Sequence, residues 1–299
     1  MTSLSVCIPT YNRPVELGNL LDSIPRSVPV NVSDNGGFLT EDFRRRFTNV
    51  RFKVAGDPAV PIFANWNSAA RMGDTEWLLV PSDDDIYFPD SFDQMSAAIA
   101  ANTQADVVVF GHHIVGETYE VLDTWQPEAR RTCAPDGFEA VKFGVDARMP
   151  SIAIRRSAMV KLGYFDEHYA LTASDSDLVQ RALLSFDTAF VPTIVSGYRV
   201  WQGGLTHRSL ATPEWLGEID YWGTKIAAMM KQIAKYADQA ATVRDELYAR
   251  NLLEGLRLLR RQGRAQECCE HFRRSRYPSK ALASTRLRIW AQVLGTYWR

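Results

Sequence analysis

Three consecutive aspartates, Asp83, Asp84 and Asp85, directly follow an apolar run at residues 77–80. Adjacent carboxylates repel one another at close range, and burial adds a desolvation cost. A hard divalent cation relieves both costs, since Mg²⁺ and Mn²⁺ prefer oxygen ligands and readily combine carboxylates with phosphate oxygens. The cluster therefore indicates a site for a metal-bound diphosphate. The structural alternative is an exposed acidic turn or a helix N-cap, because Asp is favoured at both.

Two further polar segments come directly after apolar, strand-like runs. Asp34 follows residues 28–33 and begins the turn sequence Asp-Asn-Gly-Gly. Pro9, Thr10 and Tyr11 lie where the first apolar run ends. A carboxylate at a strand end can contact a nucleoside, and Tyr11 can stack on a base. The structural alternatives are an ordinary tight turn and a simple strand-to-helix loop.

A separate pair of carboxylates, Asp175 and Asp177, begins a segment with helical periodicity. Its apolar residues, Leu178 and Leu183 among them, share one predicted helix face. A carboxylate at the start of this helix can act as a general base toward an acceptor hydroxyl. Capping of the helix by Ser174 or Asp175 is the structural alternative.

Strands and helices alternate through the first half of the chain. We expect strands at residues 4–9, 28–33, 50–54, 77–80, 106–110 and 192–200, and helices at residues 15–23, 41–47, 65–72 and 91–101. This alternation predicts an α/β fold with a mostly parallel central sheet and helices on both faces. Because ligands bind beyond the carboxyl ends of such strands, Asp34 and Asp83 should meet at one sheet edge. Residues 112–150 are less regular and are expected to surround an acceptor site.

The chain becomes helical from about residue 212. We therefore expect a catalytic domain at residues 1–210 and a helical region at residues 211–299. Two apolar helix faces are predicted there, one formed by Leu252, Leu253, Leu256 and Leu259, and the other by Trp290, Val293, Leu294 and Tyr297. Gly263 is placed to end the first of these helices.

Composition excludes several classes of protein. The chain has 299 residues, of which 46% are hydrophobic and 23% charged, which argues against disorder and against nucleic-acid binding. Residues 250–299 carry a net charge of +9, against −10 for the preceding 249 residues. This asymmetry indicates either an anionic partner or solvated, arginine-rich helix faces. Neither a signal-peptide pattern nor a long apolar run is present, so we expect a cytoplasmic protein.

Taken together, these segments resemble the family 2 glycosyltransferases, which have the GT-A fold. The resemblance runs over residues 4–206, about two thirds of the chain. The segments that carry it are residues 5–13 (Ser-Val-Cys-Ile-Pro-Thr-Tyr-Asn-Arg), 33–36, 65–69, the aspartate cluster, 163–167 and 175–178. Each segment is moderately specific, and their order and spacing make the match.

The resemblance implies transfer of a hexosyl or deoxyhexosyl group from a nucleoside-diphosphate sugar to a hydroxyl of a glycan or lipid-linked glycan, with inversion at the anomeric carbon. The implied donor-binding residues are Pro9, Thr10, Tyr11, Asp34, Asn67, Asp83 and Asp84. A Mn²⁺ or Mg²⁺ ion would bind Asp84 and Asp85, with His207 as a further candidate ligand. Asp175 occupies the position of the catalytic base.

Three departures from the family pattern concern the same site. Ser174 stands where many members have Glu, so one carboxylate on the acceptor side is missing. Many members also have a His soon after a Tyr-Arg pair. In this chain the pair is Tyr198-Arg199, Trp201 comes soon after it, and the next His is His207. Residues 57–66 hold no Arg, although some relatives place a basic residue there to contact the donor.

Two other interpretations remain open. A sugar-1-phosphate nucleotidylyltransferase shares the architecture, but its glycine-rich loop after the first strand is absent. A degenerate GT-A binding or scaffold protein without transferase activity fits the loss of Glu at Ser174, whereas the intact aspartates argue against it. The basic C-terminal helices suggest peripheral contact with the inner face of a membrane. A helical cap or a dimer surface is the alternative there. Bacterial surface polysaccharide assembly is suggested by analogy with the family alone.

Overall fold

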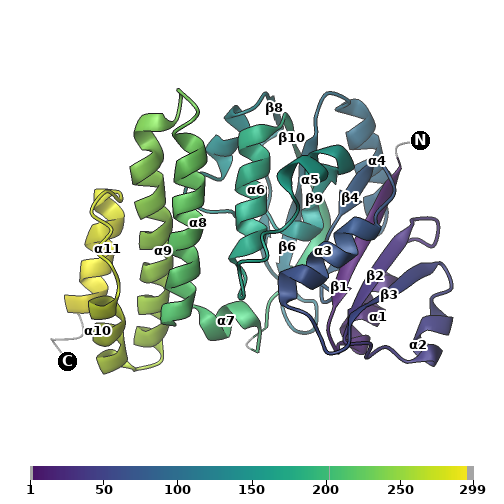
Figure 1. Cartoon of the computed structure of the whole chain (residues 1–299), viewed down its shortest axis with the longest axis horizontal. Helices are drawn as coiled ribbons and strands as arrows, with labels where there is room; N and C mark the ends of the chain where they lie inside the picture. The colour runs from purple at the N-terminus through teal and green to yellow at the C-terminus, as the bar shows by residue number, and fades with distance from the viewer. Residues whose placement is uncertain (1–2, 202, 295–299) are drawn as a thin grey trace. The chain divides into compact units, whose positions relative to one another are not determined.

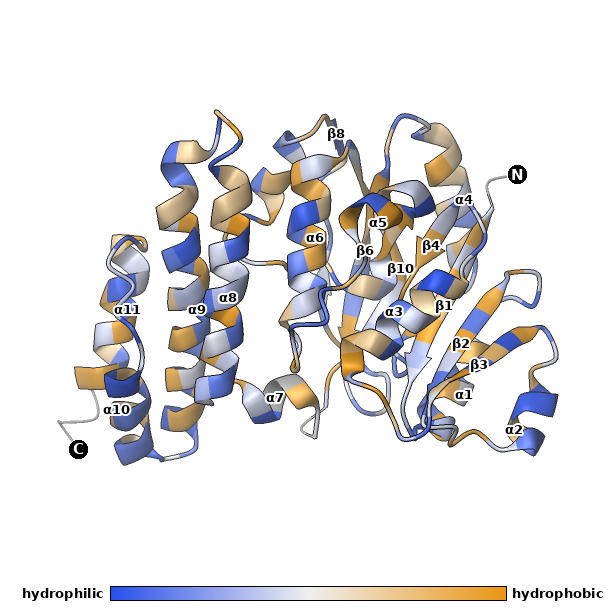
Figure 2. Ribbon diagram, in the orientation of Figure 1, coloured by the Kyte–Doolittle hydropathy of each residue, from blue (hydrophilic) through white to orange (hydrophobic). Residues whose placement is uncertain are grey.

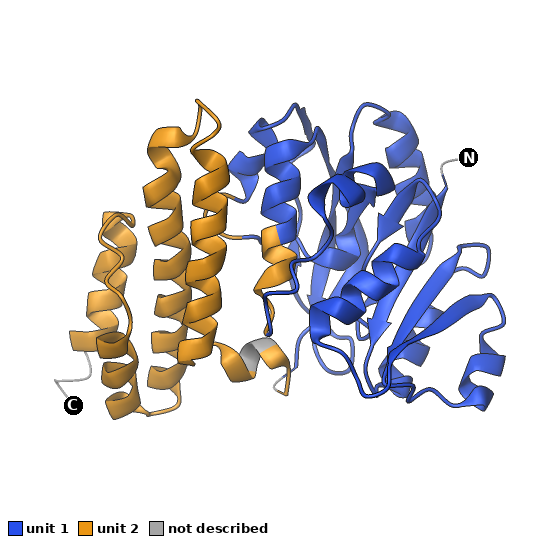
Figure 3. Cartoon of the chain, viewed as in Figure 1, with its two compact units in different colours: residues 1–141, 145–170, 178–201 blue, residues 142–144, 171–177, 202–299 orange. Residues whose placement is uncertain are grey.

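The computed structural model describes residues 3–201 and 203–294, apart from the side chains of Thr206 and His207. The chain forms two compact units (Figure 3). The first comprises Met1–Val141, Val145–Ala170 and Leu178–Trp201. The second comprises Lys142–Gly144, Leu171–Asp177 and Gln202–Arg299, so two short segments of the expected catalytic domain group with the C-terminal helices.

A ten-stranded sheet forms the centre of the first unit (Figure 1). Its strands are β1 (Leu4–Thr10), β2 (Val30–Asn35), β3 (Val50–Gly56), β4 (Trp77–Leu79), β5 (Ile86–Tyr87), β6 (Val107–Val115), β7 (Val121–Trp125), β8 (Arg130–Thr132), β9 (Ile152–Arg155) and β10 (Thr188–Arg199). The order along the sheet is β3-β2-β1-β4-β9-β6-β10-β5. Strands β3, β2, β1 and β4 are mutually parallel, as are β6 and β10, whereas β9 runs antiparallel between β4 and β6. The prediction of a mostly parallel α/β sheet is confirmed.

Helices pack against both faces of this sheet. They are α1 (Pro14–Asp22), α2 (Glu41–Arg46), α3 (Ile62–Met72), α4 (Ser91–Ala101), α5 (Arg156–Leu162) and α6 (Ala173–Ser185), with two short 3-10 turns at Asp136–Ala140 and Met149–Ser151. Because alternate strand residues point to opposite faces, Val6 and Ile8 join the core formed with α1 and α4. Cys7 points to the other face, where its sulfur adjoins Gly73 at the end of α3.

The sequence located most of these elements, but not all of them. The expected strands at residues 4–9, 28–33, 50–54, 77–80 and 106–110 correspond to β1, β2, β3, β4 and β6. Strand β9, helix α5 and the two-residue strand β5 were not predicted, and strands β7 and β8 were not located within residues 112–150. Runs of two to seven residues carry too few periods to distinguish strand from helix. Their conformation is set by neighbouring strands, such as the pairing of β9 with β4 and β6.

The second unit is helical. Its helices are α7 (Leu205–Ser209), α8 (Pro213–Met230), α9 (Ala240–Arg261), α10 (Ala265–Arg274) and α11 (Ala283–Leu294), with a 3-10 turn at Ala237–Gln239. Figure 2 shows α10 as largely hydrophilic. In the part of the chain that the structure describes, no helix combines the length and the apolar character needed to cross a bilayer.

One of the two predicted apolar faces is correct, and the other is correct only at Val293. Leu252, Leu253, Leu256 and Leu259 are all buried on α9, and Gly263 has a positive φ of 73° just beyond it. On α11, however, the buried residues are Thr285, Ile289 and Val293. Trp290 and Leu294 are 40% and 52% exposed, and Tyr297 lies outside the described residues. The error arose because both sides of α11 carry apolar residues, so periodicity could not tell which side packs on α9.

Candidate functional site

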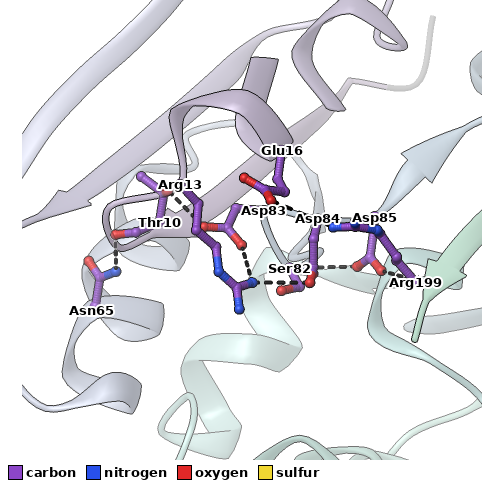
Figure 4. A network of polar contacts seen from close by, with 9 residues as sticks. All are labelled: Thr10, Arg13, Glu16, Asn65, Ser82, Asp83, Asp84, Asp85 and Arg199. Atoms are coloured by element: carbon purple, nitrogen blue, oxygen red, sulfur yellow. Dashed lines mark hydrogen bonds and ion pairs between the residues drawn. The ribbon is translucent and has the colours of Figure 1, made fainter. Parts of the chain in front are cut away.

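Asp83 is held by two donors at the carboxyl edge of the sheet (Figure 4). Thr10, the last residue of β1, donates from Oγ1 to Asp83 Oδ2 at 2.7 Å. Arg13 Nη1 lies 3.2 Å from Asp83 Oδ1. Burial raises the pKa of Asp83 to about 6, the neighbouring Asp84 carboxylate adds to that rise, and Arg13 and Thr10 oppose it. Burial and Asp84 therefore disfavour the charged form of Asp83, and Arg13 and Thr10 offset only part of that cost.

Arg13 also neutralises the next aspartate. The same nitrogen, Nη1, lies 3.0 Å from Asp84 Oδ2, so one guanidinium corner bridges both carboxylates. The position of Arg13 is fixed because it immediately precedes α1, which begins at Pro14. The Trp201 ring packs on the guanidinium, 5.3 Å from its carbon. Burial alone would lower the pKa of Arg13, but the two carboxylates raise it above its ordinary value.

Asp85 has a different environment from its two neighbours. Its Oδ2 accepts a hydrogen bond from Ser82 N at 2.9 Å, and its Oδ1 accepts one from Arg199 N at 3.3 Å. The Asp85 carboxylate thus stabilises the turn at residues 82–85 and links this turn to the end of β10. Burial, followed by the charge of Asp84, raises the pKa of Asp85 well above its usual range, and the two backbone donors lower it. Metal ligation by Asp85 stays a prediction, and it would require these bonds to be exchanged.

Asp34 lies beside Thr10, because the two residues pair in register across β1 and β2. Its fully buried carboxylate accepts hydrogen bonds from Phe38 N and Leu39 N, both at 3.0 Å, and from Arg44 Nη2 at 3.1 Å. The expected convergence of Asp34 and Asp83 is confirmed, since Thr10 adjoins both. Asp34 shapes the loop after β2, and direct contact with a nucleotide stays a prediction.

Two aromatic rings stand at this edge of the sheet. Tyr11 and Phe38 are 55% and 45% exposed, and their ring centroids are 5.3 Å apart in an edge-to-face arrangement. Tyr11 follows β1, and Phe38 is positioned by its backbone hydrogen bond to Asp34. Pro9 is buried within β1 itself. Phe38 was missed by sequence reasoning, although its position just after the Asp-Asn-Gly-Gly turn was a usable signal.

Two asparagines of α3, Asn65 and Asn67, lie in different hydrogen-bonding environments. Asn67 was expected to bind donor, but its amide bonds the loop before α6, donating to Phe165 O and Glu167 Oε1 and accepting from Phe165 N. Asn65 instead donates to Thr10 O at 3.1 Å. Its buried Oδ1 accepts no protein hydrogen bond. Asn65 is therefore the α3 residue that adjoins the Thr10–Asp83 pair with an acceptor available.

The two remaining predicted site residues belong to the second unit. Asp175 lies in the first turn of α6, half-buried, and its Oδ1 accepts from Ser176 N at 2.6 Å. Its assignment as catalytic base stays a prediction. His207 lies within α7, but its side chain is outside the described residues, so its role as a metal ligand is also untested.

The carboxylate oxygens of Asp83 and Asp84 fit a metal ion that binds together with a phosphate-bearing ligand. Among the described residues, no group of three or more His, Cys, Asp or Glu side chains converges on one point. Asp83 and Asp84 nevertheless already share a cation, the Arg13 guanidinium. Mg²⁺ commonly uses one or two carboxylates and completes its shell with phosphate oxygens and water. Of these two residues, Asp84 would hold such an ion, because Thr10 already occupies one oxygen of Asp83.

Comparison with solved structures bears on the fold. The chain matches S. aureus TarS 1–349 in complex with UDP-GlcNAc with a TM-score of 0.64, at 15% identity over 100% of this chain and 93% of that one. It matches the mannosyltransferase PcManGT from Pyrobaculum calidifontis, in complex with GDP-Man and Mn²⁺, with a TM-score of 0.55, at 16% identity over 99% of this chain and 87% of that one. The fold is that of the GT-A glycosyltransferases. No protein-family model and no curated protein matches the sequence.

Proposed function

We propose that this protein is a glycosyltransferase that uses a nucleoside-diphosphate sugar and a divalent cation, in the manner of family 2. The observation that carries the proposal is the placement of Asp83 and Asp84 at the carboxyl edge of the sheet, next to Thr10 and the Tyr11–Phe38 pair. Ligands bind at this edge in open α/β sheets. The complexes of TarS with UDP-GlcNAc and of PcManGT with GDP-Man and Mn²⁺ are consistent with such a donor.

Different residues are assigned to different parts of the donor. Tyr11 and Phe38 offer exposed ring faces to the base, and Asn65 Oδ1 offers a hydrogen-bond acceptor nearby. Asp83 is assigned to the ribose and Asp84 to the cation on the diphosphate. When bound, the cation stabilises the negative charge that develops on the departing diphosphate.

The transfer proposed is a single displacement with inversion. The acceptor hydroxyl oxygen forms a bond to the anomeric carbon while the bond from that carbon to the diphosphate oxygen breaks. Asp175 takes the proton of the hydroxyl as general base, and the nucleoside diphosphate leaves with the bonding electron pair. Pre-positioned carboxylates and donors are suited to this task because they need little reorganisation during the reaction.

The acceptor proposed is a lipid-linked glycan at the inner face of a membrane, as in assembly of a surface polysaccharide. Helix α11 supports it. Leu287, Trp290 and Leu294 are exposed on one side of this helix, and Arg286 and Arg288 flank that side. Apolar side chains bordered by arginine are typical of helices that lie in an anionic membrane surface.

A further feature of the second unit strengthens the case for an anionic surface. Arg257, Arg260 and Arg261 of α9 and Gln292 of α11 line a hollow of about 470 Å³. Cosedimentation with vesicles containing anionic phospholipid at low salt tests the membrane contact. Protein that stays in the supernatant contradicts it, and α11 is then better explained as the surface of a dimer or a cap.

A thermal-shift panel tests the proposed function. UDP, dTDP, GDP and CMP are each added with and without Mn²⁺, because a ligand that binds only the folded state raises the melting temperature. A rise for one nucleoside diphosphate that requires Mn²⁺ supports the transferase and identifies the nucleotide. No rise with any nucleotide favours a GT-A scaffold without transferase activity.

A further inference from the structure

We propose that Arg13 is a built-in counter-cation of the donor site, which a divalent cation must displace before it can bind Asp84. This inference rests on the proposed function, because it concerns the cation of that reaction. One nitrogen, Arg13 Nη1, lies 3.2 Å from Asp83 Oδ1 and 3.0 Å from Asp84 Oδ2. The guanidinium therefore stands where both carboxylates point, as Figure 4 shows.

Burial makes this pairing stronger than an ordinary surface ion pair. Asp83 and Asp84 are only 4% and 6% exposed. Two carboxylates removed from water need a nearby positive charge, and losing that charge is costly. The other arginines at this sheet edge are engaged with different carboxylates, since Arg44 pairs with Asp34 and Arg199 with Glu16. Among the described residues, Arg13 is thus the cation that pairs with Asp83 and Asp84.

A guanidinium and a divalent cation repel each other strongly at this position. A Mg²⁺-like ion binds a carboxylate oxygen at about 2 Å, and Arg13 Nη1 already lies 3.0 Å from Asp84 Oδ2. With both present, three positive charges would lie within a few ångströms of one another in a poorly solvated site, where repulsion is strong. The Arg13 side chain, which is 33% exposed, has to move toward solvent or toward the donor diphosphate.

Trp201 makes the displacement harder. Its ring packs 5.3 Å from the guanidinium carbon and so holds the side chain over the aspartates. Moving Arg13 breaks this cation–π contact as well as two ion pairs. A diphosphate relieves both problems, because its negative charges can accept the released guanidinium. Mn²⁺ should therefore bind weakly to the nucleotide-free protein and more tightly once nucleotide is present, a positive coupling between the two ligands.

The test measures binding of Mn²⁺ alone to the full chain, from the electron paramagnetic resonance signal of free Mn²⁺. Arg13→Gln should tighten Mn²⁺ binding about tenfold, because it removes the competing charge. Trp201→Leu keeps the charge but loosens the guanidinium, so it should tighten binding to a lesser extent. Arg45→Gln is the matched control, since Arg45 is exposed and pairs with Asp42 away from the site. Its Mn²⁺ affinity should equal that of the wild type.

Mn²⁺ binding that is unchanged, weaker or undetectable in Arg13→Gln overturns the proposal. If Arg13→Gln does not fold, Trp201→Leu decides, and the absence of any tightening there is equally adverse. Addition of UDP or GDP separates this inference from the proposed function. Tighter Mn²⁺ binding in Arg13→Gln without nucleotide binding in any variant leaves Arg13 as counter-cation and removes the transferase. Nucleotide binding together with unchanged Mn²⁺ affinity in Arg13→Gln supports the transferase and removes Arg13 as counter-cation.

Discussion

Thr10 Oγ1 donates to Asp83 Oδ2 at 2.7 Å, although the two residues are 73 positions apart in the sequence. This bond joins the end of β1 to the loop after β4, and it places the hydroxyl between the first strand and the aspartate pair. The Cα of Thr10 also pairs with that of Asp34 in β2. One residue thus relates the three segments on which the candidate donor site is built.

Removing this hydroxyl should weaken the site. Thr10→Val keeps the side-chain volume but leaves Asp83 with one fewer donor, and a bond to a charged group contributes about 1.5–3 kcal/mol. We expect nucleotide affinity in the presence of Mn²⁺ to fall about tenfold by isothermal titration calorimetry. Thr10→Ser retains the hydroxyl and serves as the control. Equal affinity for Thr10→Val and Thr10→Ser would show that the bond does not organise the site.

Phe38 provides a test of base stacking. Phe38→Ala removes one ring of the Tyr11–Phe38 pair, and base–aromatic stacking contributes about 1–3 kcal/mol. Affinity for the preferred nucleoside diphosphate should fall by about tenfold, while Phe38→Trp should keep it. Because Phe38 is exposed, the melting temperature should change little. Loss of stability without loss of affinity would instead assign the ring a purely structural role.

Asp175 is tested by separating binding from turnover. Asp175→Asn retains shape but cannot take the acceptor proton, so kcat should fall about a hundredfold or more while donor affinity stays near that of the wild type. Asp177→Asn is the informative comparison, because Asp177 is buried and paired with Lys225 Nζ at 3.0 Å. That variant should lose stability. Near wild-type kcat in Asp175→Asn would remove Asp175 as the base.

His112 predicts a stability change with pH. This buried residue of β6 lies 3.3 Å from Ser151 Oγ through Nδ1, and burial, followed by the charges of Arg148 and His113, lowers the pKa of His112 to about 4. The unfolded chain, with a pKa near 6.5, takes up the proton first as pH falls. The contribution of His112 to the free energy of unfolding should therefore be greatest above pH 6.5 and fall by at most about 3 kcal/mol toward pH 4.

Urea unfolding at several pH values checks this expectation. His112→Gln cannot titrate, so the variant should lose less stability, relative to the wild type, when the pH falls from 6.5 to 4. His168→Gln, which alters an exposed histidine, should leave the wild-type dependence intact. A steep acid dependence that persists in His112→Gln would place its origin in other groups.

Much of the fold could be predicted because it depends on local pattern. Buried parallel strands appear as continuous apolar runs, and Asp34 and Asp83 could be placed at one edge from the chemistry of strand ends alone. Strand β9 was not predicted because four residues carry little periodicity, and its antiparallel position depends on β4 and β6. The exposed side of α11 could not be predicted because both sides of that helix carry apolar residues.

The details of the site depend on partners that are distant in sequence. The sequence predicts that Asp85 shares the metal with Asp84, but it could not show that Arg199 N, 114 positions away, donates to the Asp85 carboxylate. Asn65 and Asn67 are two residues apart on α3 and so point in different directions. Sequence alone could not show that Asn65 bonds Thr10 and that Asn67 bonds the loop before α6. Arg13 was visible as part of a motif, but its bridge between Asp83 and Asp84 required the folded loop.

The most direct test of the central claim is calorimetric titration of UDP and GDP into the protein with and without Mn²⁺, compared between the wild type and Asp84→Asn. Asp93→Asn, which removes an exposed carboxylate of α4, is the matched control. The account predicts Mn²⁺-dependent binding of one nucleotide to the wild type and to Asp93→Asn, and loss of that dependence in Asp84→Asn. Binding that is equally dependent on Mn²⁺ in Asp84→Asn, or no nucleotide binding by the wild type, would contradict it.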